Sequence, residues 1–139
     1  MISRQLSTLM LLGLVSTTWA TPVGAAQVIS VGDGDTLTVM DAGLRVTVRL
    51  ACIDAPETAQ KPWGIEARAA LQALTPVGST VSLRGSTKDR YGRTVAEVIR
   101  GVSNVNLALV REGRAFVYRQ YLSGCDRSAY LGAEGQAEK

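Results

Sequence analysis

The chain has 139 residues, with 15 Lys and Arg, 12 Asp and Glu, and no histidine, which gives a net charge of +3. This length suits one domain and is too short for a two-domain enzyme. Without an imidazole, the sequence excludes Ser-His-Asp and Cys-His nucleophilic enzymes, a histidine general base, and histidine-ligated zinc or non-haem iron. Two cysteines cannot supply four zinc thiolates, so any bound metal would be a hard ion with oxygen ligands, such as calcium or magnesium.

Residues 1 to 26 have the layout of a secretory signal peptide. One basic residue, Arg4, precedes an apolar run that is too short to span a bilayer, and small residues follow, ending at Ala20 and again at Ala26. The alternative, a buried N-terminal helix, would need polar residues at helical spacing and a cap. We therefore expect cleavage after Ala20 or Ala26, and a secreted or periplasmic domain of residues 27 to 139 without stable membrane association.

Short β-branched or alternating runs predict the strands of this domain. The third run alternates strictly, so Arg49 lies on its polar face, away from the face that carries Cys52. Turn residues separate the strands, among them an Asp-Gly-Asp turn that ends at Asp35. The predicted strands cover residues 28–31, 36–40, 44–52, 80–83 and 94–99.

Helical spacing predicts three helices. An i, i+3, i+4, i+7 stripe that starts at Ala67 predicts an amphipathic helix, which Pro76 ends. A second helix, at about 104 to 112, ends at Gly113, where glycine can adopt the left-handed conformation. The last helix begins after Asp126. Its apolar stripe consists of Tyr130, Ala133 and Ala137.

The order of three strands, a helix and two strands is that of a five-stranded OB-type barrel, whose usual cargo is single-stranded nucleic acid or oligosaccharide. Element order alone also fits an SH3-like barrel or an α+β roll. We expect an α+β, mainly β protein, with a five-stranded OB-fold barrel and about three helices.

Acidic residues stand at the ends of the predicted strands. Asp35 precedes the second strand, Asp54 follows the third, and Glu57 lies in the loop beyond. Two or three carboxylates gathered from strand ends form a site for a hard cation, with water and a main-chain carbonyl as further ligands. Each acid taken singly is more typical of a turn. Arg49 and Arg93 favour a site, because a metal and guanidinium groups together stabilise the charge of a phosphoryl-transfer transition state.

The two cysteines allow two interpretations. Outside the cytoplasm thiols oxidise, and a disulfide between Cys52 and Cys125 would close a long loop and add roughly 4 kcal/mol of stability. Alternatively, Cys52 is a small core residue.

Four segments jointly resemble the signatures of the staphylococcal nuclease (thermonuclease) family. They occur in the family's order and spacing, and the resemblance covers about residues 27 to 137. The segments are Asp33-Gly34-Asp35-Thr36, Val48-Arg49-Leu50 running into Ile53-Asp54-Ala55-Pro56-Glu57-Thr58, Asp89-Arg90-Tyr91-Gly92-Arg93, and Val105 to Gly113. The resemblance implies a calcium-dependent phosphodiesterase on an OB-type barrel that cleaves DNA and RNA and leaves 3′-phosphate ends.

The resemblance also implies a role for each matching acid. Asp35 and Asp54 would ligate calcium together with the main-chain carbonyl of Ala55. Glu57 would act as the general base or position the attacking water. The family's best-known member has threonine where this chain has Ala55, but a main-chain ligand survives that change.

The arginines and tyrosines would contact the substrate. The resemblance implies that Arg49 and Arg93 hold the scissile phosphate and neutralise its developing charge. Tyr91 matches a family tyrosine near the nucleotide site, and Tyr118 or Tyr121 would supply a stacking ring and a phosphate contact. Core packing is the alternative for Tyr118.

Two departures from the family concern loops and the last helix. The loop from Thr58 to Gly64 is shorter than in the family and carries only Lys61 as a basic residue. The last helix is expected to be truncated, because the chain ends at Lys139 while the family's helix continues for another turn or two.

The sequence therefore predicts a monomeric, calcium-dependent and sugar-nonspecific nuclease, a hydrolase of phosphodiester bonds of endo or exo type, with DNA and RNA as substrates. The alternative is a non-catalytic OB-fold module that binds nucleic acid. Such a module would be expected to lack Glu57 or one of the arginines. A partner-binding domain is a third hypothesis.

Overall fold

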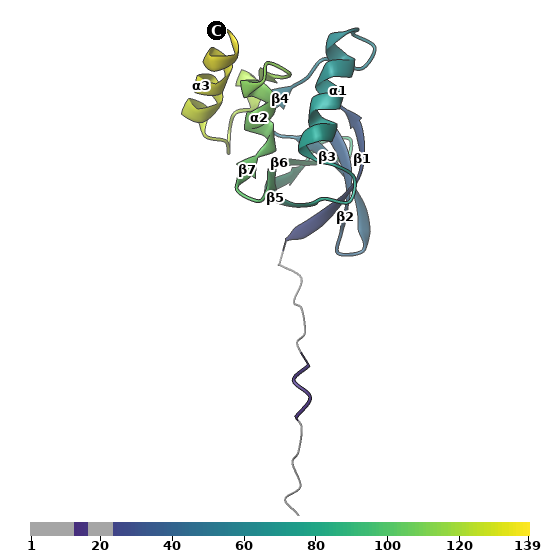
Figure 1. Cartoon of the computed structure of the whole chain (residues 1–139). Coiled ribbons are helices and arrows are strands. Elements are labelled where there is room, and N and C mark those ends of the chain that lie inside the picture. Colours follow the sequence, from purple (N-terminus) through teal and green to yellow (C-terminus); the bar gives the residue numbers. More distant parts are fainter. Residues whose placement is uncertain (1–12, 17–23) are drawn as a thin grey trace, which may run out of the picture.

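The computed structural model describes residues 13–16 and 24–139 (Figure 1). The signal peptide predicted over residues 1 to 26 lies mostly outside the described residues. Ala25 and Ala26 are described, and they are the first residues of strand β1. Because Ala26 is buried and pairs with a neighbouring strand on either side, cleavage after Ala26 would remove part of the barrel, whereas cleavage after Ala20 would leave β1 complete.

Five strands form a closed barrel. They pair in the antiparallel order β3-β2-β1-β5-β6, and a parallel pairing between β3 and β6 closes the ring. This arrangement confirms the predicted five-stranded OB-fold barrel of an α+β, mainly β protein. The strands are β1 (Ala25–Asp33), β2 (Thr36–Asp41), β3 (Leu44–Leu50), β5 (Thr80–Lys88) and β6 (Thr94–Arg100).

The period-two pattern of the strands places the core inside the barrel. Leu37 and Val39 of β2 are fully buried, as are Val48 and Leu50 of β3. Between these strands, the hairpin turn at Ala42 and Gly43 has two positive φ angles, 48° and 79°, the combination of a tight hairpin whose twist matches that of the strands.

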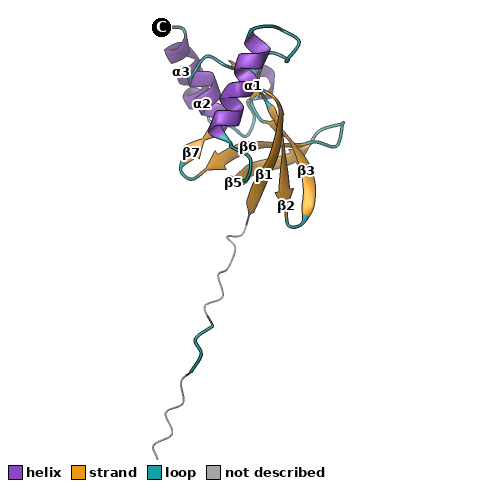
Figure 2. Cartoon of the chain, turned by 45° about the vertical axis from the view of Figure 1, so that its right-hand side comes forward, coloured by secondary structure: helices purple, strands orange, loops and turns teal. Residues whose placement is uncertain are grey.

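Three helices gather at one end of the barrel, as Figure 2 shows. The first begins at Trp63, four residues before the predicted stripe, and has no side-chain cap. The other two begin and end close to the predicted positions, and their caps explain why. The Asn104 side chain accepts a hydrogen bond from the Leu107 N–H, and the Asp126 side chain accepts one from the Ala129 N–H. After the second helix, Gly113 has a φ of 72°. The helices are α1 (Trp63–Leu74), α2 (Val105–Arg111) and α3 (Arg127–Ala137).

Four short elements were not predicted, and the third strand ends earlier than expected. The strand was predicted to reach Cys52, but β3 ends at Leu50 because Cys52 adopts a left-handed conformation with a φ of 69°. A two-stranded sheet follows, in which β4 (Ile53–Asp54) pairs with β8 (Phe116–Val117). The remaining short elements are β7 (Ser103–Asn104) and the 3-10 helix η1 (Arg119–Tyr121).

Among the described residues, the helices are too short or too polar to cross a membrane.

A disulfide joins the end of the barrel to the segment that leads into α3. Cys52 and Cys125, 73 positions apart in the chain, have their sulfur atoms 2.01 Å apart. Cys52 is also buried in the core, so its side chain both packs and cross-links.

A buried carboxylate holds α3 on the barrel. Glu97 of β6 is only 5% exposed. It accepts hydrogen bonds from the Tyr130 hydroxyl at 2.5 Å, from Asn104 Nδ2 at 2.6 Å, and from Arg84 at 3.1 Å. Burial, together with the hydrogen bond to Glu97, raises the pKa of Tyr130 far above its usual value, so the phenol remains a proton donor. Tyr130 thereby connects α3 to β6.

Tyr130→Phe is expected to lower the free energy of unfolding by about 1.5–3 kcal/mol, because the Glu97 carboxylate loses a donor inside the core. Urea denaturation followed by circular dichroism measures the change. Tyr121→Phe, at a residue that is 62% exposed, is the matched control and should leave the midpoint unchanged. An unchanged midpoint for Tyr130→Phe would contradict the assigned role of this hydrogen bond.

The Cys52→Ser/Cys125→Ser double variant is expected to be less stable than the oxidised protein by roughly 4 kcal/mol, since the unfolded chain is no longer constrained across a long loop. Urea denaturation with and without reductant checks this. Protein made in an oxidising compartment should show no reactive thiol after denaturation without reductant, and two reactive thiols would refute the bond.

Candidate active site

Two acidic side chains from different turns meet at one guanidinium group. Arg49 Nη2 lies 3.4 Å from Oδ2 of Asp35 and 3.4 Å from Oδ1 of Asp54. The pairing of Thr36 with Arg49 in the β2–β3 ladder explains the first contact, because Asp35 immediately precedes Thr36. The structure thus brings together three of the side chains that the sequence predicts for the site.

Main-chain carbonyl groups hold the other edge of Arg49. Its Nη1 donates to the carbonyl oxygens of Leu50 at 2.6 Å and Ile53 at 2.9 Å. The side chain is 15% exposed. Its orientation is therefore fixed by the turn after β3, and Nη2 is left facing the two carboxylates.

Asp35 is buried and strongly hydrogen-bonded. Its Oδ2 accepts from the Ala55 N–H at 2.8 Å, and its Oδ1 accepts from the Thr36 hydroxyl at 3.2 Å. Burial raises the pKa of Asp35 to about 6, although the Arg49 charge and the Ala55 N–H act in the opposite direction. A cation bound at this carboxylate would favour its ionised form.

The donor set at this position fits a hard cation. Asp35, Asp54 and the main-chain carbonyl of Ala55 supply only oxygen ligands, the kind that calcium prefers. Glu57 does not join them: within residues 13–16 and 24–139, no three acidic or cysteine side chains come together as a metal-binding group. A cation here would thus be held by two carboxylates, a carbonyl and water.

Glu57 opens a tight turn between β4 and α1. Its N–H donates to Oε1 of Gln60, and its carbonyl accepts from the Gln60 N–H, both at 2.8 Å. The first turn of α1 packs directly against this main chain, since a Cβ added at Gly64 would lie 1.7 Å from the carbonyl oxygen of Glu57. Only glycine fits at position 64.

The same helix also supports the turn that carries Asp35. A Cβ added at Gly34 would lie 2.6 Å from Cβ of Ala67 and 2.9 Å from Cβ of Ala55. Gly34, Gln60 and Gly64 were not among the predicted site residues. A glycine inside the first turn of a helix, where it is unfavourable by about 1 kcal/mol, was the available signal for Gly64.

Arg93 lies in the turn between β5 and β6, held by Asp89. The Arg93 side chain donates to Oδ2 of Asp89 at 2.8 Å, and the N–H groups of Tyr91 and Arg93 donate to Oδ1. Desolvation would raise the pKa of Asp89, but these hydrogen bonds outweigh it and lower the pKa. Because Val48 pairs with Thr94, this turn lies at the rim of the barrel beside the strand that carries Arg49.

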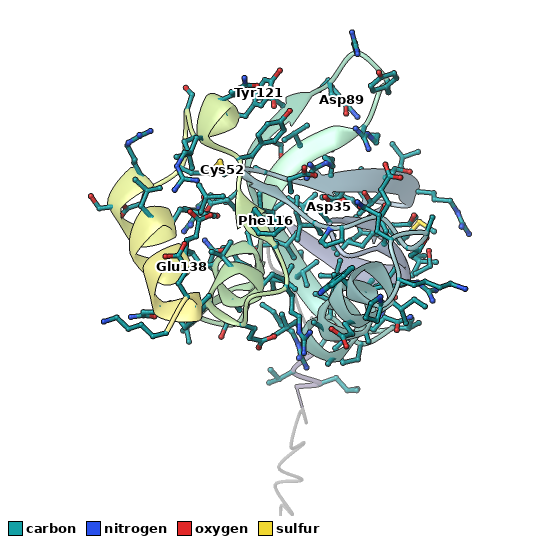
Figure 3. All side chains as sticks on the ribbon, turned by 90° about the horizontal axis from the view of Figure 1, so that it is seen from above. Asp35, Cys52, Asp89, Phe116, Tyr121 and Glu138 are labelled. Atoms are coloured by element: carbon teal, nitrogen blue, oxygen red, sulfur yellow. A yellow bond between two sulfur atoms is a disulfide. The ribbon has the colours of Figure 1, made fainter. Side chains whose placement is uncertain are left out.

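The three candidate substrate tyrosines are exposed. The Tyr91 ring is 69% exposed and lies against the guanidinium groups of Arg90 and Arg93, at 4.9 and 5.6 Å. The Tyr118 and Tyr121 rings pack edge to face with centroids 4.7 Å apart. Tyr118 is 37% exposed, so it is not a core residue. In Figure 3, Tyr121 and Asp89 lie on the same side of the molecule.

Comparison with known proteins identifies the family of this chain. The family model described as staphylococcal nuclease homologue matches residues 47–139. An uncharacterized endonuclease of Haemophilus influenzae is 38% identical over 124 residues, which are 87% of this chain and 68% of the relative. An uncharacterized endonuclease of Escherichia coli O157:H7 is 42% identical over 98 residues, 68% of this chain and 61% of the relative. A micrococcal nuclease of Shigella flexneri is 36% identical over 113 residues, 75% of this chain and 64% of the relative.

The matches to nuclease relatives place this OB-fold barrel among the hydrolases that act on nucleic acids. Within that class, the chain belongs to the staphylococcal nuclease family. It spans less than two thirds of the length of the Escherichia coli and Shigella relatives.

Gly64→Ala is expected to lower the kcat of nucleic-acid cleavage by about 10²-fold with a smaller change in KM, because the added methyl group must displace the Glu57 main chain. Steady-state kinetics on single-stranded DNA measures both constants. Gly132→Ala is the matched control, since a Cβ there meets nothing within 4 Å. Should Gly64→Ala fail to fold, Gln60→Ala removes the Glu57 hydrogen bond without a clash. Full kcat in both variants would show that α1 does not position Glu57.

Proposed function

We propose that this protein is a calcium-dependent nuclease that hydrolyses phosphodiester bonds of DNA and RNA, leaves 3′-phosphate ends, and acts after export from the cytoplasm. The observation that carries the proposal is the position of Arg49, whose Nη2 lies 3.4 Å from both Asp35 and Asp54. A phosphate at this rim would meet a fixed guanidinium group next to a set of cation ligands.

In the proposed mechanism, Asp35, Asp54 and the Ala55 carbonyl would hold calcium, which when bound would supply positive charge and increase the acidity of water. Glu57 accepts a proton from the attacking water at its carboxylate. The water oxygen forms a bond to phosphorus while the bond to the 5′ oxygen breaks. Solvent water gives a proton to the leaving 5′ oxygen, and Glu57 returns its proton to the solvent.

In this mechanism the arginines stabilise negative charge and do not transfer protons. Arg49 is held by carbonyl groups before the substrate arrives, so its Nη2 is already oriented toward the site, where a phosphate oxygen would compete with the two carboxylates for it. Arg93 would approach from the neighbouring turn. The exposed rings of Tyr91, Tyr118 and Tyr121 suit contact with unstacked bases of any sequence.

Export is supported by the layout of residues 1 to 26, and the burial of Ala26 in β1 favours cleavage after Ala20. Sequencing the N-terminus of the exported protein tests this part of the proposal, and a mature chain that begins at Gln27 would contradict the preferred cleavage position.

Cleavage of plasmid DNA and of RNA is expected with calcium and not with EDTA. Glu57→Gln and Arg93→Ala should each lower kcat by about 10²-fold or more, the effect of losing one preorganised group. Arg45→Ala, which removes an exposed arginine from the same strand as Arg49, should cleave normally. Activity that resists EDTA would refute the calcium site. Full turnover by Glu57→Gln would refute the role of Glu57. Binding of nucleic acid without cleavage would indicate a non-catalytic module.

A further inference from the structure

An open groove of about 300 Å³ lies beside the candidate active site, at the first turn of α1. None of the residues that line it was predicted to contact substrate. The lining includes Pro56, Gln60, Trp63, Glu66, Arg114 and Phe116.

Two large aromatic rings of the groove are turned to solvent. Trp63 is 64% exposed and Phe116 is 66% exposed. Neither ring belongs to the core, so folding does not explain them. Exposed aromatic rings that line a concave surface are typical of a binding site.

The groove is continuous with the site. Pro56 stands between Ala55 and Glu57, and Phe116 pairs with Asp54 in the β4–β8 ladder. Phe116 and Tyr118 are two residues apart, with Val117 buried between them, so both rings project from the outer face of the chain at β8.

The polar groups at the groove suit the edges of bases. Arg114 Nη1 pairs with Oε2 of Glu66 at 2.7 Å, and both side chains are partly exposed, so donors and acceptors face the solvent beside the rings. Gln60 lines the groove and also accepts the Glu57 N–H. A ligand in the groove would therefore contact Gln60, whose side chain accepts a hydrogen bond from the Glu57 N–H.

We propose that this groove binds a base of single-stranded nucleic acid immediately next to the cleaved phosphodiester bond, by stacking on Phe116 and Trp63. This inference rests on the proposed function. Tyr91, Tyr118 and Tyr121 are then contacts for nucleotides on one side of the cleaved bond, and the groove is a subsite for a nucleotide on the other side. Stacking is indifferent to sequence because every base has an aromatic face.

The fluorescence of Trp63 tests the groove without cleavage. The chain contains two tryptophans, so the full chain carrying Trp19→Phe retains Trp63 alone as the reporter. In EDTA, a short oligothymidylate should quench its emission, and an abasic strand of equal length should not. Phe116→Ala should weaken oligothymidylate binding by roughly 5- to 150-fold, the range for loss of one base–aromatic stack. Val102→Ala, at an exposed residue outside the groove, is the control and should bind normally.

Kinetics then show which nucleotide occupies the groove. With calcium, oligonucleotides that have one cleavable bond and an abasic residue on one side or the other are cleaved by wild type and by Phe116→Ala. Phe116→Ala should have a higher KM than wild type for the complete strand. For one of the two abasic strands, the two proteins should have the same KM. The proposal would be overturned if Phe116→Ala raised KM equally for the complete strand and both abasic strands. It would also be overturned if oligothymidylate did not quench Trp63. If binding and KM are unchanged in Phe116→Ala, the groove serves another partner and the inference is wrong. If wild type cleaves none of the strands, the proposed function is wrong. The quenching experiment still shows whether the groove binds a base.

Discussion

The parallel pairing of β3 with β6 is the contact on which both the core and the candidate site depend. It joins segments far apart in the chain through three consecutive residue pairs, Val48 with Thr94, Arg49 with Val95, and Leu50 with Ala96. Leu50 and Ala96 point inward and are fully buried. The same pairing places the turn that carries Arg93 beside the strand that carries Arg49, so closing the barrel also assembles the two arginines.

Close packing of α1 supports the turns that carry two of the acids, in addition to their side-chain contacts. Helix α1 touches the Asp35 turn through Ala67 and Gly34, and the Glu57 turn through Gly64. Contacts this short leave no room for adjustment, because backbone cannot move aside as a flexible side chain can. One helix therefore fixes the turn of Asp35 relative to the turn of Glu57, and in the proposed mechanism such preorganisation would reduce the cost of reaching the transition state.

Local patterns predicted most of the fold, and the sequence also indicated that Asp35, Arg49 and Asp54 lie together. Long-range packing accounts for the rest. Strand alternation and capping residues are read within a few positions, which explains the success at β2 and α2. The predicted end of β3 was wrong because no local pattern indicates the left-handed conformation of Cys52. The β4–β8 pairing joins Ile53 to Val117, and strands of two residues carry no periodic signal. The roles of Gly64 and the groove depend on which segment packs against α1, which a single sequence does not reveal.

In the disulfide, Cys52 lies two residues before Asp54, and Cys125 lies one residue before Asp126, the N-cap of α3. It therefore cross-links the rim that carries Asp54 to helix α3. When reductant opens the bond, the two parts are still held together by the Glu97 network, by the hydrogen bonds of Glu134 in α3 with the Val117 N–H and with Arg119, and by apolar packing. The chemical state of the surroundings thus becomes a determinant of the stability of this rim: the protein is most rigid in an oxidising medium and loosest in a reducing one, without any change in sequence or ligand.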